Sequence, residues 1–204
     1  KRAYPRVKPP FPAVIGVWGC PTIINNIETL TNIPEIVKNG GEWFSKIGAA
    51  AHPGTLLFGV SGHVNKPGVY ELETGTPLMT IINDVCGGVK NGKQIKMVIP
   101  GGSSMPPLTR EECLTMKMDN ESLKAIGSAI GTAGVMVMDE DTDLLKVLKR
   151  ITKFYYHESC GQCTPCREGC GWMLRVLDRI DRGEGRQEDL DLLISVAENI
   201  EGNT

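Results

Sequence analysis

Hydrophobic residues recur at three- and four-residue steps in several parts of the chain, and this spacing predicts amphipathic helices. One such pattern covers residues 25–48, where Asn26 is a candidate N-cap and Pro34 is expected to begin a second helix. Three more patterns lie near the end of the chain, at residues 141–158, 171–180 and 187–200. Because short connections join these three amphipathic helices, they are expected to form a helical bundle.

The central part of the chain has a different pattern, in which short apolar runs are bounded by glycine, proline and asparagine. These runs predict β-strands at residues 55–62, 68–72, 95–102 and 134–139. Residues 77–88 read instead as one helix with a glycine stop. One helix among four or five strands suggests a β-grasp module.

The patterns divide the chain into residues 1–50, 51–139 and 140–204, with a mixed α/β part followed by an all-helical part. The formal net charge of −2 excludes a strongly basic nucleic-acid-binding protein. No apolar run approaches the roughly 18 to 20 residues that span a bilayer. The chain opens on Lys1 without a signal-like segment, and both of its ends are expected to be interior points of a longer protein.

Four of the seven cysteines fall in the stretch "HESCGQCTPCREGCG", at residues 157–171. An odd number of unevenly spaced cysteines is a poor disulfide framework. Their clustering in a chain without a secretory signal indicates a reducing compartment and metal binding. The spacing of Cys160, Cys163 and Cys166 is that of three thiolates that share one cubane cluster. Zinc sites usually present one pair of closely spaced ligands and a second such pair many residues away. The run therefore favours an iron–sulfur cluster, while structural zinc and metal-free thiols remain alternatives.

Cys170 completes the ferredoxin spacing C-x2-C-x2-C-x3-C, but in ferredoxins this fourth cysteine binds a second cluster. Gly171 stands where a ferredoxin has proline, and the chain contains no second run of this kind. Cys170 is therefore predicted to start a helix and pack near the cluster, with ligation as the lesser alternative. The fourth ligand is expected from elsewhere, and Cys20, Cys86 and Cys113 do not lie in ligand-like loops.

Blocks along the whole chain are similar to one known family. They are "KPPFPAVIGVWGCPTIINNIETL", "NGGEWFSKIG", "VSGHVNKPGVYEL", "VIPGGSS", "VMDEDTD" and "FYYHESCGQCTPCREG". In this order they resemble the flavin- and NADH-binding subunits of respiratory complex I, the F-subunit family of NADH-quinone oxidoreductases. Its relatives include the diaphorase subunits of NAD-linked hydrogenases and formate dehydrogenases.

The resemblance implies the tail of a flavin-binding α/β domain at 1–50 and a β-grasp domain of the soluble-ligand-binding type at 51–139. It implies an iron–sulfur helical bundle, incomplete here, at 140–204. The implied chemistry is hydride transfer from NADH to FMN and one-electron transfer to a [4Fe-4S] cluster, on the way to quinone. By position in the family motifs, the cluster ligands are Cys160, Cys163 and Cys166, the FMN contacts are Asn25, Asn26 and Thr29, and Phe11 stacks on the adenine of NADH.

Two family features are expected outside these residues. The glycine-rich flavin loop would precede Lys1, and the fourth cluster cysteine would follow Thr204, so the fragment alone is expected to bind neither cofactor well. The implied partners are a small thioredoxin-like [2Fe-2S] subunit and a large iron–sulfur subunit. Contact with a membrane would run only through partners, on the cytoplasmic face in a bacterium or the matrix face in a mitochondrion. The alternatives are a hydrogenase or formate dehydrogenase diaphorase, and a non-enzymatic binding module stabilised by zinc.

Overall fold

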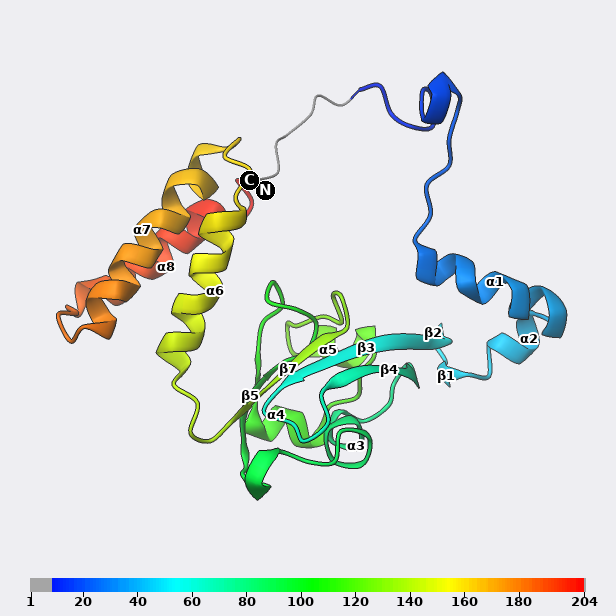
Figure 1. The fold of residues 1–204 in the computed structure, drawn as a ribbon, viewed down its shortest axis with the longest axis horizontal. Helices are drawn as coiled ribbons and strands as arrows, with labels where there is room; N and C mark the ends of the chain where they lie inside the picture. Colours follow the sequence, from blue (N-terminus) through cyan, green and yellow to red (C-terminus); the bar gives the residue numbers. More distant parts are fainter. Residues whose placement is uncertain (1–8, 204) are drawn as a thin grey trace. The chain divides into compact units, whose positions relative to one another are not determined.

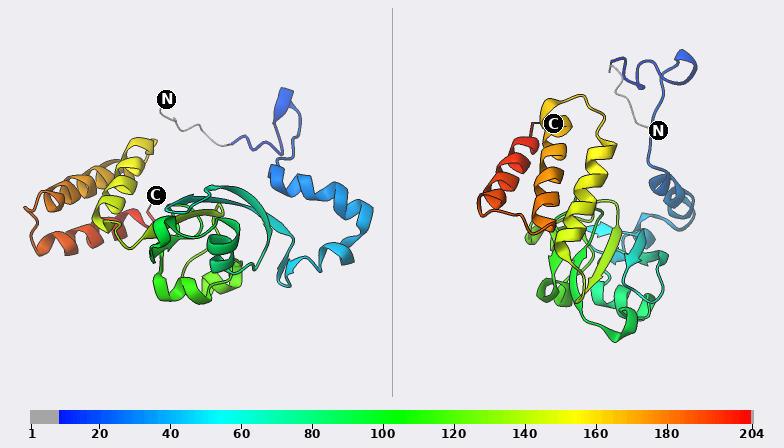
Figure 2. Two further views of the ribbon diagram at one scale, coloured as in Figure 1. Left: turned by 60° about the horizontal axis from the view of Figure 1, so that its bottom comes forward. Right: turned by 60° about the vertical axis from the view of Figure 1, so that its left-hand side comes forward.

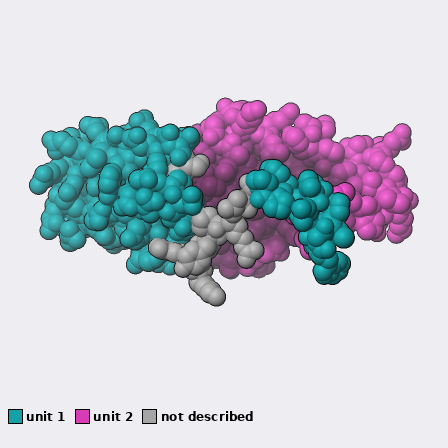
Figure 3. Space-filling model, turned by 90° about the horizontal axis from the view of Figure 1, so that it is seen from above, with its two compact units in different colours: residues 1–22, 143–204 teal, residues 23–142 magenta. Residues whose placement is uncertain are grey.

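The structure is a computed structural model that describes residues 9–203. It divides into two compact units, one of Ile23–Thr142 and the other of Lys1–Thr22 with Asp143–Thr204 (Figure 3). The fold is mixed α/β, with sheets confined to the first of these units and the three longest C-terminal helices in the second. No helix within the described residues is long and apolar enough to cross a membrane.

A five-stranded sheet forms the centre of the Ile23–Thr142 unit, in the order β4-β3-β7-β5-β6 (Figure 1). The strand bounds are Thr55–Gly62 for β3, Gly68–Glu73 for β4, Ile95–Ile99 for β5, Leu108–Thr109 for β6 and Gly134–Asp139 for β7. Strand β3 pairs antiparallel with β4 and parallel with β7, while β5 runs antiparallel to both β6 and β7. The four predicted strands are confirmed, and β3 and β7 have the predicted bounds.

Residues 51–139 contain more helices than the one predicted there. The predicted helix begins as α3 (Leu78–Thr80) and continues as a π-helical turn, η2 (Ile81–Val85). Two short helices were not predicted, α4 (Arg110–Thr115) and α5 (Asn120–Ala125). Each has only six residues, which is too short for a helical period to stand out.

Side-chain caps mark the starts of both short helices. Thr109 and Glu112 form a capping box at α4, and Asp119 accepts a hydrogen bond from the amide of Ser122 at α5. Smaller elements complete the chain: η1 (Val17–Gly19), β1 (Gly48–Ala49), β2 (His52–Pro53) and η3 (Lys90–Gly92).

One apolar core lies between the sheet and its helices. Its fully buried side chains come mainly from the inward face of β3, from α3 and η2, and from β7: Phe58, Val60, Leu78, Ile81, Ile82, Leu123, Val135 and Val137. Cys86 and Cys113 are buried in the same core, and burial raises the pKa of both thiols, that of Cys113 to about 12. These two cysteines therefore serve as small apolar side chains, not as exposed thiolates.

Helix α1 (Ile27–Asn39) precedes the sheet, and Asn26 caps it as predicted. The expectation that Pro34 begins a second helix is wrong, because Pro34 lies inside α1. Proline removes one backbone donor, and the hydrogen bonds on either side keep the helix continuous. A second short helix, α2 (Gly41–Phe44), follows Gly40, whose φ of +89° suits glycine.

Three helices form the C-terminal part, α6 (Leu144–Glu158), α7 (Thr164–Asp181) and α8 (Glu188–Ile200). They lie side by side in Figures 1 and 2, with α7 in contact with both of the others. The predicted helical segments are confirmed. Asp143 caps α6, because its carboxylate accepts hydrogen bonds from the amides of Leu145 and Lys146 at 3.0 and 3.3 Å.

Ion pairs tie these helices together. Lys149 of α6 lies 2.7 Å from both Asp178 and Asp181 of α7. Arg179 of α7 donates to the nearly buried carboxylate of Asp189 at the start of α8. This contact holds the pKa of Asp189 below its ordinary range. The pairs therefore link both neighbouring helices to α7, the helix that follows the cysteine loop.

Candidate metal centre

The cysteine run spans the connection between α6 and α7. Helix α6 ends at Glu158, and the chain turns through Gly161, whose φ is +80°. Such a φ is costly for any residue with a side chain, so glycine permits the turn. Helix α7 then begins at Thr164, with a proline in its first turn.

This start is earlier than the sequence predicts. The apolar pattern places the loop as far as Cys170, but Cys163 is the N-cap of α7, and both Cys166 and Cys170 lie within the helix. Pro165 explains the difference, since its fixed φ favours the first turn of a helix. The three predicted ligands therefore come from one loop residue, Cys160, and from the start of α7.

The three thiols differ in exposure and in contacts. Cys160 is exposed, whereas Cys163 and Cys166 are half-buried, and all three are free thiols. The sulfur of Cys166 lies 3.4 Å from the hydroxyl oxygen of Ser159, which also accepts a hydrogen bond from the amide of Gly161 at 3.3 Å. Ser159 thus connects the end of α6 to both the loop and one candidate ligand.

The chemistry of this donor set fits a cubane cluster. Three cysteine thiols on one turning segment provide soft sulfur ligands, which iron–sulfur clusters require. Each thiolate of a cubane binds a different iron atom, so the sulfurs need not converge on one point. Between residues 9 and 203, no three cysteine, histidine or acidic side chains are arranged to hold a single metal ion. It is the soft sulfur donors and their spacing that favour a cluster over zinc.

Cys170 has the properties of a packing residue. Its side chain is buried, and burial, followed by the neighbouring Cys166, raises the pKa of its thiol to about 11. The two sulfurs are 3.9 Å apart, one helical turn along α7. Its burial within α7 is that of a small apolar side chain packed inside the bundle.

Arg167 folds back over the cysteine loop. Its guanidinium donates to the backbone carbonyls of Gly161 and Gln162 at 2.9 and 3.3 Å and to the hydroxyl of Thr164 at 3.1 Å. Its Nε also donates to the carboxylate of Glu168 at 3.0 Å. Neither residue type nor helical period predicts the contacts of Arg167. Its position one residue after the last ligand is the available signal.

The residues predicted to contact FMN gather at the N-terminal end of α1. Asn25 and Asn26 precede the helix, Thr29 lies in its first turn, and all three are exposed. The side-chain oxygen of Asn26 accepts hydrogen bonds from the amides of Glu28 and Thr29 at 2.8 and 3.4 Å. Phe11, the predicted NADH contact, is about half exposed (54%) and belongs to the other unit.

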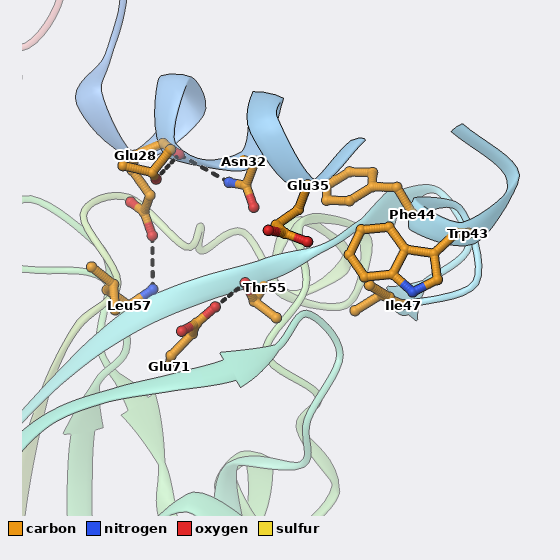
Figure 4. A pocket seen from close by; sticks show the side chains of 10 residues that line it. Glu28, Asn32, Glu35, Trp43, Phe44, Ile47, Thr55, Leu57 and Glu71 are labelled. Carbon is orange, nitrogen blue, oxygen red and sulfur yellow. Dashed lines mark hydrogen bonds between the residues drawn. The ribbon is translucent and has the colours of Figure 1, made fainter. Parts of the chain in front are cut away.

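A cavity of about 420 Å³ lies between α1, α2 and the strands β3 and β4 (Figure 4). Glu28 spans it and accepts a hydrogen bond from the amide of Leu57 at 2.8 Å, while the hydroxyl of Thr55 donates to Glu71 at 2.8 Å. Glu35 adds a third carboxylate to the lining. Three carboxylates in one lining would repel a phosphate group, so this cavity is poorly suited to bind one.

Two family profiles match adjoining parts of the chain. The profile described as "SLBB domain" matches residues 56–147, and "NADH-ubiquinone oxidoreductase-F iron-sulfur binding region" matches residues 146–204. The second match contains the whole cysteine run, so this part of the chain is an iron–sulfur binding region.

Curated relatives match the chain along its full length. The F subunit of NADH-quinone oxidoreductase from Rickettsia bellii is 50% identical over 205 residues, covering 100% of this chain and 49% of the relative. The same subunit from Rickettsia typhi is 47% identical, covering 100% of this chain and 48% of the relative. The chain thus spans about half the length of these relatives.

A solved structure shares the fold. An NAD⁺-reducing [NiFe]-hydrogenase in its H2-reduced state superposes with a TM-score of 0.81 and 33% sequence identity, over 98% of this chain and 34% of that chain. Identity to the Rickettsia proteins is higher and extends over every part of the sequence. Over its whole length the chain is therefore similar to F subunits of NADH-quinone oxidoreductase, of which it matches about half.

Proposed function

We propose that this chain is part of an electron-input subunit. In it NADH is oxidised at FMN, and single electrons leave through a [4Fe-4S] cluster on the way to quinone. The observation that carries the proposal is the placement of Cys160, Cys163 and Cys166 on one loop and helix turn within the iron–sulfur binding region. The F subunit of NADH-quinone oxidoreductase from Rickettsia bellii is 50% identical to the chain, which supports the proposal.

The proposed domain boundaries follow the sequence patterns. Residues 1–50 are the C-terminal part of an FMN- and NADH-binding domain, residues 51–139 a β-grasp domain, and residues 140–204 an iron–sulfur bundle. The match of the SLBB profile to residues 56–147 supports the second of these. A fourth cluster ligand would come from outside these residues, because a cubane needs four.

The chain's own residues would bind and orient the cofactors. At the start of α1, the side-chain amides of Asn25 and Asn26 and the hydroxyl of Thr29 offer hydrogen bonds without adding charge. A helix N-terminus also favours a phosphate group. Phe11 would stack on the adenine of NADH. Bound FMN would supply the exchange between two-electron and one-electron chemistry, while the protein holds it in position.

A second candidate is the diaphorase subunit of an NAD-linked hydrogenase or formate dehydrogenase. The structural similarity to an NAD⁺-reducing hydrogenase favours it, although at the lower identity of 33%.

In a complex I, the partners would be the small thioredoxin-like [2Fe-2S] subunit and the large iron–sulfur subunit, with membrane contact only through partners. Its place would be the inner face of a bacterial membrane or the matrix side in mitochondria. Co-purification with these subunits or with a hydrogenase separates the two candidates.

Metal analysis of the intact protein tests the proposal directly. We expect about four iron atoms and four acid-labile sulfides on this bundle, since that is the content of a cubane cluster. The flavin content should be one FMN for each chain. About one zinc ion without sulfide would contradict the proposal and support the zinc-stabilised binding module.

Replacing Asn26 with aspartate in the intact protein is expected to weaken FMN binding by about tenfold or more while leaving α1 folded. Aspartate caps helices as well as asparagine does, so the contacts to Glu28 and Thr29 are retained. The new negative charge, however, would oppose the flavin phosphate, and a hydrogen bond to a charged group contributes roughly 1.5–3 kcal/mol. Fluorescence titration of the flavin-free protein with FMN measures the change.

Asn32, which lies on α1 beyond its first turn, provides a control for the added charge. Asn32→Asp should leave FMN affinity unchanged, because the residue is outside the proposed flavin contacts. Equal affinity of the Asn26→Asp protein and the unaltered protein would contradict the placement of FMN at this helix end.

A further inference from the structure

We propose that Arg167 is a positioning residue that holds the cysteine loop in the conformation that presents its thiols to the cluster. This inference rests on the proposed function, since it assigns Arg167 a task only if the loop binds iron. The guanidinium reaches back over six residues to the carbonyl of Gly161 and over five to that of Gln162. Both carbonyls lie between the first two candidate ligands, Cys160 and Cys163.

The contacts of Arg167 connect the two ends of the ligand run. Arg167 directly follows Cys166 in α7, and the carbonyls it binds directly follow Cys160 in the loop. A guanidinium presents its donors in a planar fork, so one side chain can bind several acceptors in a fixed geometry. The hydrogen bonds therefore restrict the distance between the loop and the first turn of the helix.

Two further contacts fix the guanidinium itself. The hydroxyl of Thr164 accepts from one end of the fork at 3.1 Å, and the carboxylate of Glu168 accepts from Nε at 3.0 Å. Both partners lie in the first turns of α7, so the arginine is anchored on the helix and not on the loop. The loop carbonyls are thus held against a rigid element, which is the general way in which a protein preorganises a binding site.

The charge of Arg167 adds to the effect of its geometry. Thiolates and the cluster they bind carry negative charge, which a fixed cation on the same segment would favour. Net charge around an iron–sulfur cluster also affects its reduction potential. Removing the cation should therefore lower the potential, because the reduced cluster carries one more negative charge than the oxidised one.

The experiment compares Arg167→Gln, Arg167→Lys and Arg175→Gln in the intact protein. Lysine keeps the charge without the planar fork, and glutamine removes both. Arg175 is the matched control, because it is an exposed arginine of α7 that lines a small pocket together with Arg167 and Gly161. Unlike Arg167, it makes no hydrogen bond to the described loop residues. The readouts are the rate of iron loss to a chelator, the EPR-monitored reduction potential, and amide hydrogen exchange of residues 159–163 in the metal-free protein.

We expect Arg167→Gln to lose iron about tenfold faster, as is typical when a residue that supports metal ligands is removed. Its reduction potential should fall and its loop amides should exchange faster. Arg167→Lys should also exchange and lose iron faster, because the fork is gone, but should keep a potential closer to that of the unaltered protein. Arg175→Gln should behave as the unaltered protein in all three measurements.

Two results would count against these statements in different ways. If the unaltered protein holds its cluster and Arg167→Gln retains iron and loop protection equally well, the inference about Arg167 is overturned while the proposed function stands. If the unaltered protein contains neither iron nor sulfide, the proposed function fails, and the cluster role of Arg167 fails with it.

Discussion

Replacing Cys163 with serine in the intact protein is expected to reduce electron transfer beyond the flavin to background while leaving FMN bound. Serine is close to cysteine in size but is a poor ligand for iron, so the cluster would lose one of its thiolates. The candidate flavin residues lie on α1, in a different compact unit from the cysteine loop. The measurements are the EPR signal of the reduced cluster, the flavin content, and NADH oxidation with an acceptor that takes electrons from the flavin.

The matched control for this variant is Cys170→Ala. Cys170 is buried in α7, and in the ferredoxin spacing the fourth cysteine does not bind the cluster of the first three, so its loss should leave the cluster signal in place. Loss of the cluster in Cys170→Ala together with its retention in Cys163→Ser would reverse the assignment of ligand and packing residue. Loss of flavin in Cys163→Ser would contradict separate sites for the two cofactors.

The second large effect is expected in the sheet unit, where Phe58→Ala should lower the free energy of unfolding by about 3–5 kcal/mol. The side chain of Phe58 is fully buried (0% exposed) on β3, the strand that pairs with both β4 and β7. Removing the ring would leave a cavity beneath the middle of the sheet. Hydrogen exchange of the amides of β3, β4 and β7, followed in increasing urea, measures the loss for this unit alone.

Leu57→Ala is the natural comparison, because Leu57 is the preceding residue on the same strand and is half exposed (49%). Its side chain points to the opposite face of the sheet, so its removal should cost less than about 1 kcal/mol. A similar loss of protection in both variants would mean that the two faces of β3 contribute equally, contrary to the burial pattern.

The strands that the sequence predicts well are apolar runs with clear boundaries. At residues 55–62 and 134–139, short apolar runs bounded by turn-forming residues predict the bounds of β3 and β7. The short helices α4 and α5 escape prediction because six residues make fewer than two turns. The prediction for Pro34 is wrong because a proline inside a helix removes only one backbone hydrogen-bond donor. The cap at Asn26 and the other hydrogen bonds of α1 are retained.

The candidate site is predicted only as far as residue type and spacing reach. The spacing of Cys160, Cys163 and Cys166 predicts an iron–sulfur loop, and the iron–sulfur profile confirms a binding region there. The contacts of Ser159 and Arg167 depend on how the chain turns at Gly161, which no local pattern specifies. The roles of Asn25, Asn26, Thr29 and Phe11 stay predictions, because they rest on position in the family motifs alone.

Cys163 also shows where function and stability compete in this fold. It occupies the N-cap position of α7, yet no side-chain cap bond forms there within the described chain, whereas α1 and α6 begin with capping side chains. A capping residue would stabilise the helix by roughly 0.5–2 kcal/mol. Under the proposed ligand role, α7 lacks this stabilisation at its start, and the sulfur atom of Cys163 is free to bind iron.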